Sequence, residues 1–208
     1  MIHEVSHPLI KHHLSRLRDK ATRPAEFRQA VQRLAVLLAY EATKDLRLAA
    51  IEIETPITRM KAEELGERVG LVPILRAGLG MVDPILNLIP TAEVWHLGLY
   101  RDEETALPVE YYSKLPETEP VDAALVVDPM LATGGSAIAA LAALKRWGVR
   151  KLKVLSIIGS QFGVGAVREK FPEADVYVCA IDAELNSRKF IVPGLGDAGD
   201  RICNTLRS

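Results

Sequence analysis

The chain has little of what marks several specialised protein classes. It contains two cysteines, Cys179 and Cys203, in 208 residues and no C-x-x-C pair. A disulfide framework or a zinc site is therefore not expected, which fits a reducing cytoplasm. No apolar run reaches the ~20 residues that span a bilayer. The N-terminus, with Glu4, Lys11 and Arg16, lacks the apolar core of a signal peptide. We expect a cytoplasmic protein with no membrane partner.

An excess of charge is also missing. The net charge is −1, from 26 Lys and Arg against 27 Asp and Glu. Proteins that bind nucleic acid generally are more basic, so nucleic acid is not an expected partner. The charge is uneven, because residues 1–50 hold nine basic and five acidic residues and four of the five histidines. This segment is either a solvated basic face or a contact for an anionic effector or a second subunit.

The histidines of this segment do not form a metal-binding pattern. His7, His12 and His13 have poor spacing for one helix face, and no acid or cysteine completes a ligand set. We expect no metal site formed by protein side chains alone.

The chain does contain 49% hydrophobic residues. Apolar residues at helical spacing predict an amphipathic helix over 24–43, with Pro24 in its first turn. Isoleucines at even spacing, interrupted by Pro56, predict an edge strand or hairpin near 51–57. The polar segment 61–68 predicts a short surface helix or turn.

From residue 69 onward, short apolar runs alternate with helical patterns. The patterns predict helices at 78–88, 135–147 and 164–171, and strands at 71–75, 94–100, 109–114, 125–128, 152–158 and 176–181. This alternation predicts an α/β fold, a mostly parallel sheet flanked by helices, with an N-terminal helix and a small edge hairpin or hood. At this length we expect a single domain over 1–208.

The positions of three polar residues predict a ligand crevice. Arg76, Arg101 and Asp128 each follow a predicted strand. Ligands of such sheets bind beyond the carboxyl ends of the strands. Spacing alone therefore predicts that all three residues face one crevice.

The segment 126–136, VVDPMLATGGS, carries the strongest local signal. A buried strand ends at Asp128, whose carboxylate can accept hydrogen bonds from two vicinal hydroxyls. The loop amides and the start of the next helix can hold a phosphate. The alternative is a tight strand–helix connection that carries an acid by chance. The hydroxyls of Thr133 and Ser136 favour the phosphate site.

The two arginines allow two interpretations each. The guanidinium of Arg76, at a buried strand end, needs an anionic partner, either a protein carboxylate or a diphosphate that it can bind in bidentate fashion. Arg101 opens the polar segment Arg-Asp-Glu-Glu-Thr, which by itself is typical of a solvated loop.

The segment 194–199 matches the dinucleotide pattern G-x-G-x-x-G. We reject that interpretation because only nine residues follow Gly199, too few for the helix, strand and acid of a dinucleotide unit. The segment instead offers a backbone that can approach a flat ligand closely.

Together these segments resemble the type I phosphoribosyltransferase family. The segment 126–136 is similar to the family's phosphoribosyl-pyrophosphate (PRPP) signature. Most members have two acids after the strand, and Asp128-Pro129 resembles the variant of the uracil branch. Similarity to that branch extends over nearly the whole chain, with further matches at 72–81 (VPILRAGLGM), 98–105 (GLYRDEET) and 191–201 (IVPGLGDAGDR).

The resemblance implies a reaction and a set of site residues. Uracil and PRPP would give UMP and pyrophosphate, a step of pyrimidine salvage. Arg101, on a flexible lid, and Asp197 would be the catalytic residues, and Ile191, Gly196, Asp197 and Ala198 would bind uracil. PRPP would be bound by Arg76, Arg101, Asp128, Pro129, Met130, Leu131, Ala132, Thr133, Gly134, Gly135, Ser136 and Asp197.

The resemblance also implies partners. Mg²⁺ would be carried on PRPP, because Asp128-Pro129 lacks a second adjacent carboxylate. Relatives form homo-oligomers, so a dimer or tetramer is expected, and some respond to GTP as an effector. Phe190 stands where many relatives have Tyr, so a tyrosine hydroxyl beside the uracil loop is missing here. Two alternatives stay open, namely transfer to another free base and a non-catalytic regulator that binds nucleotides or RNA.

Overall fold

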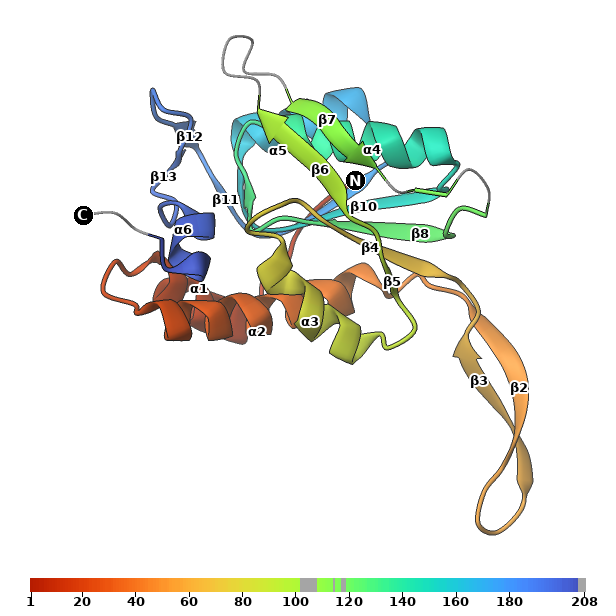
Figure 1. Ribbon diagram of the computed structural model, residues 1–208. Coiled ribbons are helices and arrows are strands. Elements are labelled where there is room, and N and C mark those ends of the chain that lie inside the picture. The colour runs from red at the N-terminus through yellow and green to blue at the C-terminus, as the bar shows by residue number, and fades with distance from the viewer. Residues whose placement is uncertain (102–107, 114, 117–118, 206–208) are drawn as a thin grey trace.

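A parallel sheet forms the centre of the molecule in the computed structural model, which describes residues 1–101, 108–113, 115–116 and 119–205, with only the backbone at 98–101 and 108–113. Its strands are β1 (Ile2–Glu4), β4 (Val69–Pro73), β5 (Glu93–Val94), β8 (Ala123–Val127), β9 (Met130–Leu131), β10 (Lys151–Ser160) and β11 (Asp175–Asp182). The seven-stranded sheet has the order β1-β11-β10-β8-β4-β5, with β9 beside β10, and every pairing is parallel (Figure 1). The predicted fold class is confirmed.

Helices cover both faces of the sheet. On one face lie α1 (Pro8–Arg18), α2 (Pro24–Ala42) and α3 (Leu79–Leu88), and on the other lie α4 (Gly135–Trp147) and α5 (Gln161–Lys170), while the short α6 (Ala198–Cys203) packs near α2 (Figure 1). No helix in the described part of the chain is both long and apolar enough to cross a membrane.

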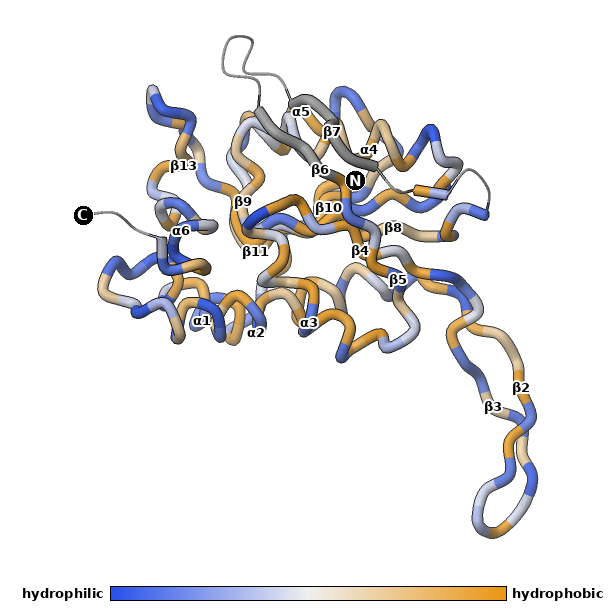
Figure 2. Tube along the Cα trace, in the orientation of Figure 1, coloured by the Kyte–Doolittle hydropathy of each residue, from blue (hydrophilic) through white to orange (hydrophobic). Residues whose placement is uncertain are grey.

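Alternation along the strands divides the core into two hydrophobic clusters. In β8, Leu125 and Val127 belong to the cluster under α2 and α3, while Ala124 and Val126 belong to the cluster under α4 and α5. Because both faces are covered, the strand is apolar at every position. Figure 2 shows this hydrophobic centre in orange, with bluer segments at the periphery.

Two tryptophans that are distant in the sequence meet at the edge of the second cluster. Trp95 follows β5 and Trp147 ends α4, and their ring centroids lie 5.5 Å apart in an edge-to-face arrangement. Both are partly buried and pack against the core.

Three antiparallel hairpins extend this framework. They are β2 (Leu48–Glu54) with β3 (Arg59–Leu65), β6 (Leu97–Arg101) with β7 (Pro108–Ser113), and β12 (Glu184–Leu185) with β13 (Ile191–Val192). The β2–β3 hairpin projects from the body as a separate two-stranded sheet (Figure 1). The β2–β3 hairpin is the one expected near 51–57. We call the β12–β13 hairpin and the turn between its strands the hood.

Some predictions from the pattern were wrong in detail. Segment 61–68, predicted as a helix or turn, is mostly the strand β3. The strand was not recognised because almost every side chain of β2 and β3 is exposed, so the sequence shows no alternation of buried and exposed residues. The predicted strand 94–100 is two strands, β5 and β6. The predicted helix 78–88 is α3, which runs through Pro84. The strand β1 and the helix α1 were not predicted.

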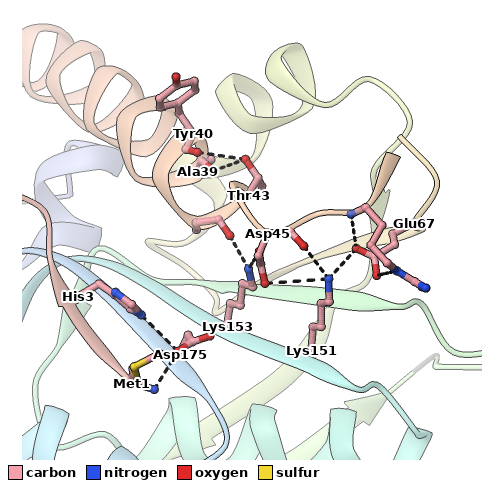
Figure 3. A network of polar contacts seen from close by, with 12 residues as sticks. Met1, His3, Ala39, Tyr40, Thr43, Asp45, Glu67, Lys151, Lys153 and Asp175 are labelled. Atoms are coloured by element: carbon pink, nitrogen blue, oxygen red, sulfur yellow. Dashed lines mark hydrogen bonds and ion pairs between the residues drawn. The ribbon is translucent and has the colours of Figure 1, made fainter. Parts of the chain in front are cut away.

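A buried lysine anchors the segment that leads into the β2–β3 hairpin (Figure 3). Lys153 on β10 is 1% exposed, and its ammonium donates to the carbonyl oxygen of Ala42 at 2.5 Å and pairs with the carboxylate of Asp45. A buried charge is tolerated only when it is paired and hydrogen-bonded. This lysine therefore holds the end of α2 against the sheet.

A second ion-pair cluster closes the base of the hairpin. The carboxylate of Glu67 accepts hydrogen bonds from Lys151 Nζ at 2.8 Å, from Arg47 Nε at 2.9 Å and from the Arg47 amide at 3.0 Å. Burial opposes ionisation of Glu67, but these bonds outweigh it and lower its pKa to about 2. Residues on both sides of the hairpin are thereby tied to β10.

The Lys153–Asp45 pair gives a stability prediction. Asp45→Ala should lower the free energy of unfolding by about 3 kcal/mol, because it leaves a buried ammonium without its counter-ion. Lys153→Met should cost about 1 kcal/mol or less, because it removes the charge and keeps the volume. Urea unfolding of both variants measures the difference, and equal losses would show that the pair acts through packing alone.

Candidate active site

One cavity of about 310 Å³ lies at the carboxyl ends of β4 and β8, facing the β12–β13 hairpin. Its walls come from residues 75–77, from Asp128, Met130 and Ala132, and from residues 189–191 and 196–199. Three segments that are distant in the sequence thus meet. Arg76 and Asp128 line one cavity, as the strand spacing predicts, and the C-terminal glycine segment joins them there.

The predicted site residues divide according to their place around this cavity. All four uracil-binding candidates line it, as do Arg76, Asp128, Met130 and Ala132. The remaining residues of the segment 128–136, which we call the phosphate loop, do not line it. Pro129 and Leu131 are buried, while residues 133–136 lie around the start of α4. Arg101 is the last residue of β6 and its side chain is not described, and residues 102–105 of the expected lid lie outside the described residues.

Asp128 follows β8 directly and is partly buried at the cavity wall. Its Oδ1 atom accepts a long hydrogen bond of 3.4 Å from the amide of Met130. Burial raises the pKa of Asp128 to about 7, the Met130 amide opposes this rise, and the neighbouring carboxylate of Asp197 adds to it. Asp128 therefore changes charge near neutral pH, and a ligand that donates hydrogen bonds favours its ionised form.

The loop between Asp128 and α4 rests on the start of α5. Ser160 Oγ donates to the carbonyl oxygen of Ala132 at 2.5 Å and accepts from the amide of Gly163 at 2.8 Å. A Cβ on Gly163 would lie 2.4 Å from the same Ala132 oxygen, so only glycine permits this contact. Gly134, with φ of +82°, then turns the chain into α4.

Arg76 lies on the turn after β4, where the Leu75–Arg76 peptide is cis. Its guanidinium is 59% exposed rather than buried, and Nη2 lies 3.1 Å from Oδ1 of Asp200. The protein carboxylate that sequence reasoning left open is thus a partner of Arg76. An exposed pair of this kind contributes little to stability, so the arginine can exchange Asp200 for a ligand anion at low cost.

The glycine segment forms the wall beneath the hood. Gly194 and Gly196 have φ of +57° and +82°. Asp197 is the N-cap of α6, and its Oδ1 atom accepts the amide of Asp200 at 2.8 Å. Because α6 has only six residues, the segment does not open the long helix of a dinucleotide unit. This supports the rejection of the dinucleotide interpretation.

An ion pair with α1 fixes the first half of this segment. The guanidinium of Arg18 binds both carboxylate oxygens of Asp182 at 2.7 Å and donates to the carbonyl oxygen of Gly194 at 2.9 Å. Asp182 also accepts the Gly194 amide at 2.9 Å. Burial opposes ionisation of Asp182, but Arg18 and this amide outweigh it and lower its pKa.

A second guanidinium fixes the other half. Arg201 is 8% exposed and donates to the carbonyl oxygens of Leu17 at 2.5 Å, Leu195 at 2.8 Å and Asp19 at 2.7 Å. It also lies 4.2 Å from the ring centroid of Phe27. Sequence reasoning missed these supporting residues, because no local pattern shows that α1 reaches the C-terminal segment.

A comparison with known families agrees with this geometry. The model of the family described as uracil phosphoribosyltransferase matches residues 4–205. The chain belongs to the uracil phosphoribosyltransferase family. The family resemblance inferred from the motifs is confirmed.

Individual members of the uracil phosphoribosyltransferase family are closely similar to the chain. The uracil phosphoribosyltransferase of Roseiflexus castenholzii is 55% identical over 199 residues, 96% of each chain, and that of Symbiobacterium thermophilum is 54% identical over 202 residues, 97% of each. A solved structure of a protein from Aquifex aeolicus has a TM-score of 0.89 at 40% identity over 97% of each chain. A hypoxanthine phosphoribosyltransferase from Staphylococcus aureus shares the fold, with a TM-score of 0.50 at 13% identity over 76% of each chain.

The contact between the phosphate loop and α5 gives a second prediction, with a control on the same helix. Gly163→Ala should displace the loop, because its Cβ would meet backbone oxygens of Leu131 and Ala132 at 2.7 and 2.4 Å. We expect a loss on the order of 10²-fold in kcat/KM for PRPP. A Cβ at Gly165 meets nothing within 4 Å, so Gly165→Ala should keep full activity and stabilise the protein by roughly 0.5–1 kcal/mol. Steady-state kinetics and thermal unfolding test both, and parallel behaviour of the two variants would contradict the loop contact.

Proposed function

We propose that the chain transfers the phosphoribosyl group of PRPP to uracil, giving UMP and pyrophosphate. The observation that carries this proposal is the single cavity that joins Asp128, Arg76 and the 196–199 segment in a member of the uracil phosphoribosyltransferase family. The reaction requires an acid that binds the sugar, a base that binds the diphosphate, and a backbone segment that can approach the flat nucleobase closely.

The phosphate loop and Asp128 would hold the ribose 5-phosphate part of PRPP. The carboxylate of Asp128 accepts hydrogen bonds from the ribose hydroxyls. The amides of Ala132, Thr133, Gly134, Gly135 and Ser136 surround the 5-phosphate at the start of α4. Met130 lines the cavity beside them, and buried Pro129 and Leu131 support the loop. Fixing the distant phosphate converts binding energy into correct placement of the reacting carbon.

Arg76 and Arg101 would bind the diphosphate. As the C1–O bond breaks, its electron pair leaves with the diphosphate, and guanidiniums placed there stabilise the growing negative charge. Arg76 releases Asp200 and takes the ligand anion in its place. Arg101 acts from the lid, whose closure excludes water that would otherwise hydrolyse PRPP.

The base would lie against the backbone of Ile191, Gly196, Asp197 and Ala198. Main-chain N–H and C=O groups in this wall match the alternating donors and acceptors along one edge of uracil. Arg18 and Arg201 hold the wall in place, so a base with the wrong pattern leaves polar groups unpaired. N1 of uracil forms the new bond to C1 and loses its proton. Asp197 orients or accepts that proton through Oδ2, which makes no hydrogen bond to the described residues.

Mg²⁺ would enter with PRPP. The carboxylates of Asp128 and Asp197 share the cavity, and oxygen ligands of this kind suit Mg²⁺ together with substrate phosphates. The adjacent Pro129 offers no further ligand, because its carbonyl oxygen accepts the amides of Ile157 and Ile158 at 3.0 Å. When bound, the ion neutralises charge on the diphosphate.

Regulation, assembly and location are further parts of the proposal. A second cavity of about 270 Å³ between α1 and α2 is lined by His12, His13, Arg16 and Arg33 among others. This basic lining supports GTP as an effector. Exposed apolar residues of the β2–β3 hairpin, including Ile57 at 94% exposure, support a homo-oligomer, a dimer or tetramer. A cytoplasmic location is consistent with the two cysteines being unpaired.

The proposed reaction is tested by a panel of bases. Purified protein with PRPP and Mg²⁺ should release pyrophosphate with uracil and not with xanthine or adenine, and added GTP should raise the rate if it is an effector. Release with another base alone would replace uracil as the substrate. No release with any base, together with nucleotide or RNA binding, would favour the non-catalytic alternative.

The raised pKa of Asp128 predicts a pH dependence of PRPP binding. Below pH 7 Asp128 is protonated in the free site and must lose a proton to accept both ribose hydroxyls, so the Kd should fall by about tenfold per pH unit up to pH 7 and level off above it. Calorimetric titration from pH 5.5 to 8.5 measures this. The titration of PRPP itself is the same with the variant Asp128→Asn, which lacks only the titration of Asp128. A profile of the variant identical to that of the wild type would remove Asp128 as the cause.

A further inference from the structure

Lys189 occupies an unusual backbone position at the tip of the hood. The turn over residues 186–190 is tightly held, because Oδ1 of Asn186 accepts the amides of Arg188 at 3.0 Å and Phe190 at 2.9 Å. The backbone of Asn186 also donates to the carbonyl oxygen of Phe190 at 2.9 Å. Within this turn Lys189 has φ of +64°.

That conformation favours glycine and is unfavourable for lysine. A side chain at positive φ crowds its own backbone, and glycine adopts the same conformation without strain. Residues held in this way are concentrated at ligand-binding sites. The backbone conformation of the turn does not require a lysine. We therefore look for a function of the lysine side chain.

Lys189 is one of the residues that line the candidate active site. Its neighbours Phe190 and Ile191 line the same cavity, to which the turn after β4 contributes residues 75–77. The charged lining residues are the acids Asp128 and Asp197 and the bases Arg76 and Lys189. Arg76 is paired with Asp200, whereas no ion pair joins Lys189 to any described residue.

We propose that Lys189 is a substrate-binding residue whose ammonium contacts the diphosphate of PRPP from the hood side of the cavity. The inference rests on the proposed function, since the diphosphate is the most highly charged group that the cavity would hold. Arg76 then binds the diphosphate from the β4 side and Lys189 from the hood, so that the anion bridges two walls. An ammonium on a tightly held turn loses less freedom on binding than one on a mobile loop.

The test compares Lys189→Gly, Lys189→Arg and Arg188→Gln. Lys189→Gly removes the charge and relieves the backbone, so its thermal unfolding temperature should not fall. We expect its Kd for Mg²⁺–PRPP and for pyrophosphate to rise about tenfold, the effect of one charge-assisted hydrogen bond. Lys189→Arg should restore most of this affinity. Arg188→Gln removes a charge from the same turn without touching the cavity wall and should leave both Kd values unchanged.

Calorimetry measures the two dissociation constants, and steady-state kinetics measure the KM for uracil, which Lys189→Gly should not change. The inference is overturned if Lys189→Gly leaves pyrophosphate affinity intact, if only the uracil KM rises, or if Arg188→Gln causes the same loss. Because PRPP and pyrophosphate are titrated directly, the result stands even if another base proves to be the acceptor. Failure of the uracil assay is therefore distinguishable from failure of this inference.

Discussion

The parallel pairing of β4 with β8 is the constraint on which the site depends. Pro73 is paired with Val127, and the Ile74 amide donates to the Val127 carbonyl oxygen at 3.0 Å. This register brings the two strands to an end side by side, so the Arg76 turn and Asp128 leave the sheet at adjacent points. A slip of one residue would reverse the faces of the strand and exchange its side chains between the two hydrophobic clusters. The hydrophobic core thus fixes the relative position of a guanidinium and a carboxylate that never contact each other through hydrogen bonds.

The third wall depends on the helix nearest the N-terminus. Arg18 and the carbonyl oxygens of Leu17 and Asp19 lie at the end of α1, and they bind the segment around Gly194 and its neighbour Leu195 directly or through Arg201. The hydrogen-bonding capacity of a loop rich in exposed backbone is thereby satisfied from a distant part of the chain. The wall proposed to bind the base is held in place by these bonds, although it contains little regular secondary structure.

Most of the sheet could be predicted, because its strands are buried on both faces and segments with a helical pattern separate them. Gly148 ends α4 where expected, and the acid after β8 marked the crevice. The hairpin β2–β3 could not be recognised in full, since exposed strands such as RMKAEEL are held by pairing with a neighbour and not by burial. The roles of Arg18, Asp182 and Arg201 were equally hidden, because their partners are up to 184 residues away. Lys189 gave no signal, since a positive φ is a property of the folded turn.

The edge-to-face pair of Trp95 and Trp147 has a practical consequence for spectroscopy. These are the two tryptophans of the chain, so all of its indole fluorescence arises from one place. Trp95 lies two residues before β6, on the side of the sheet that carries α4. Emission from the protein therefore reports the surroundings of β6 and the end of α4, and events confined to the hood need a separately introduced probe.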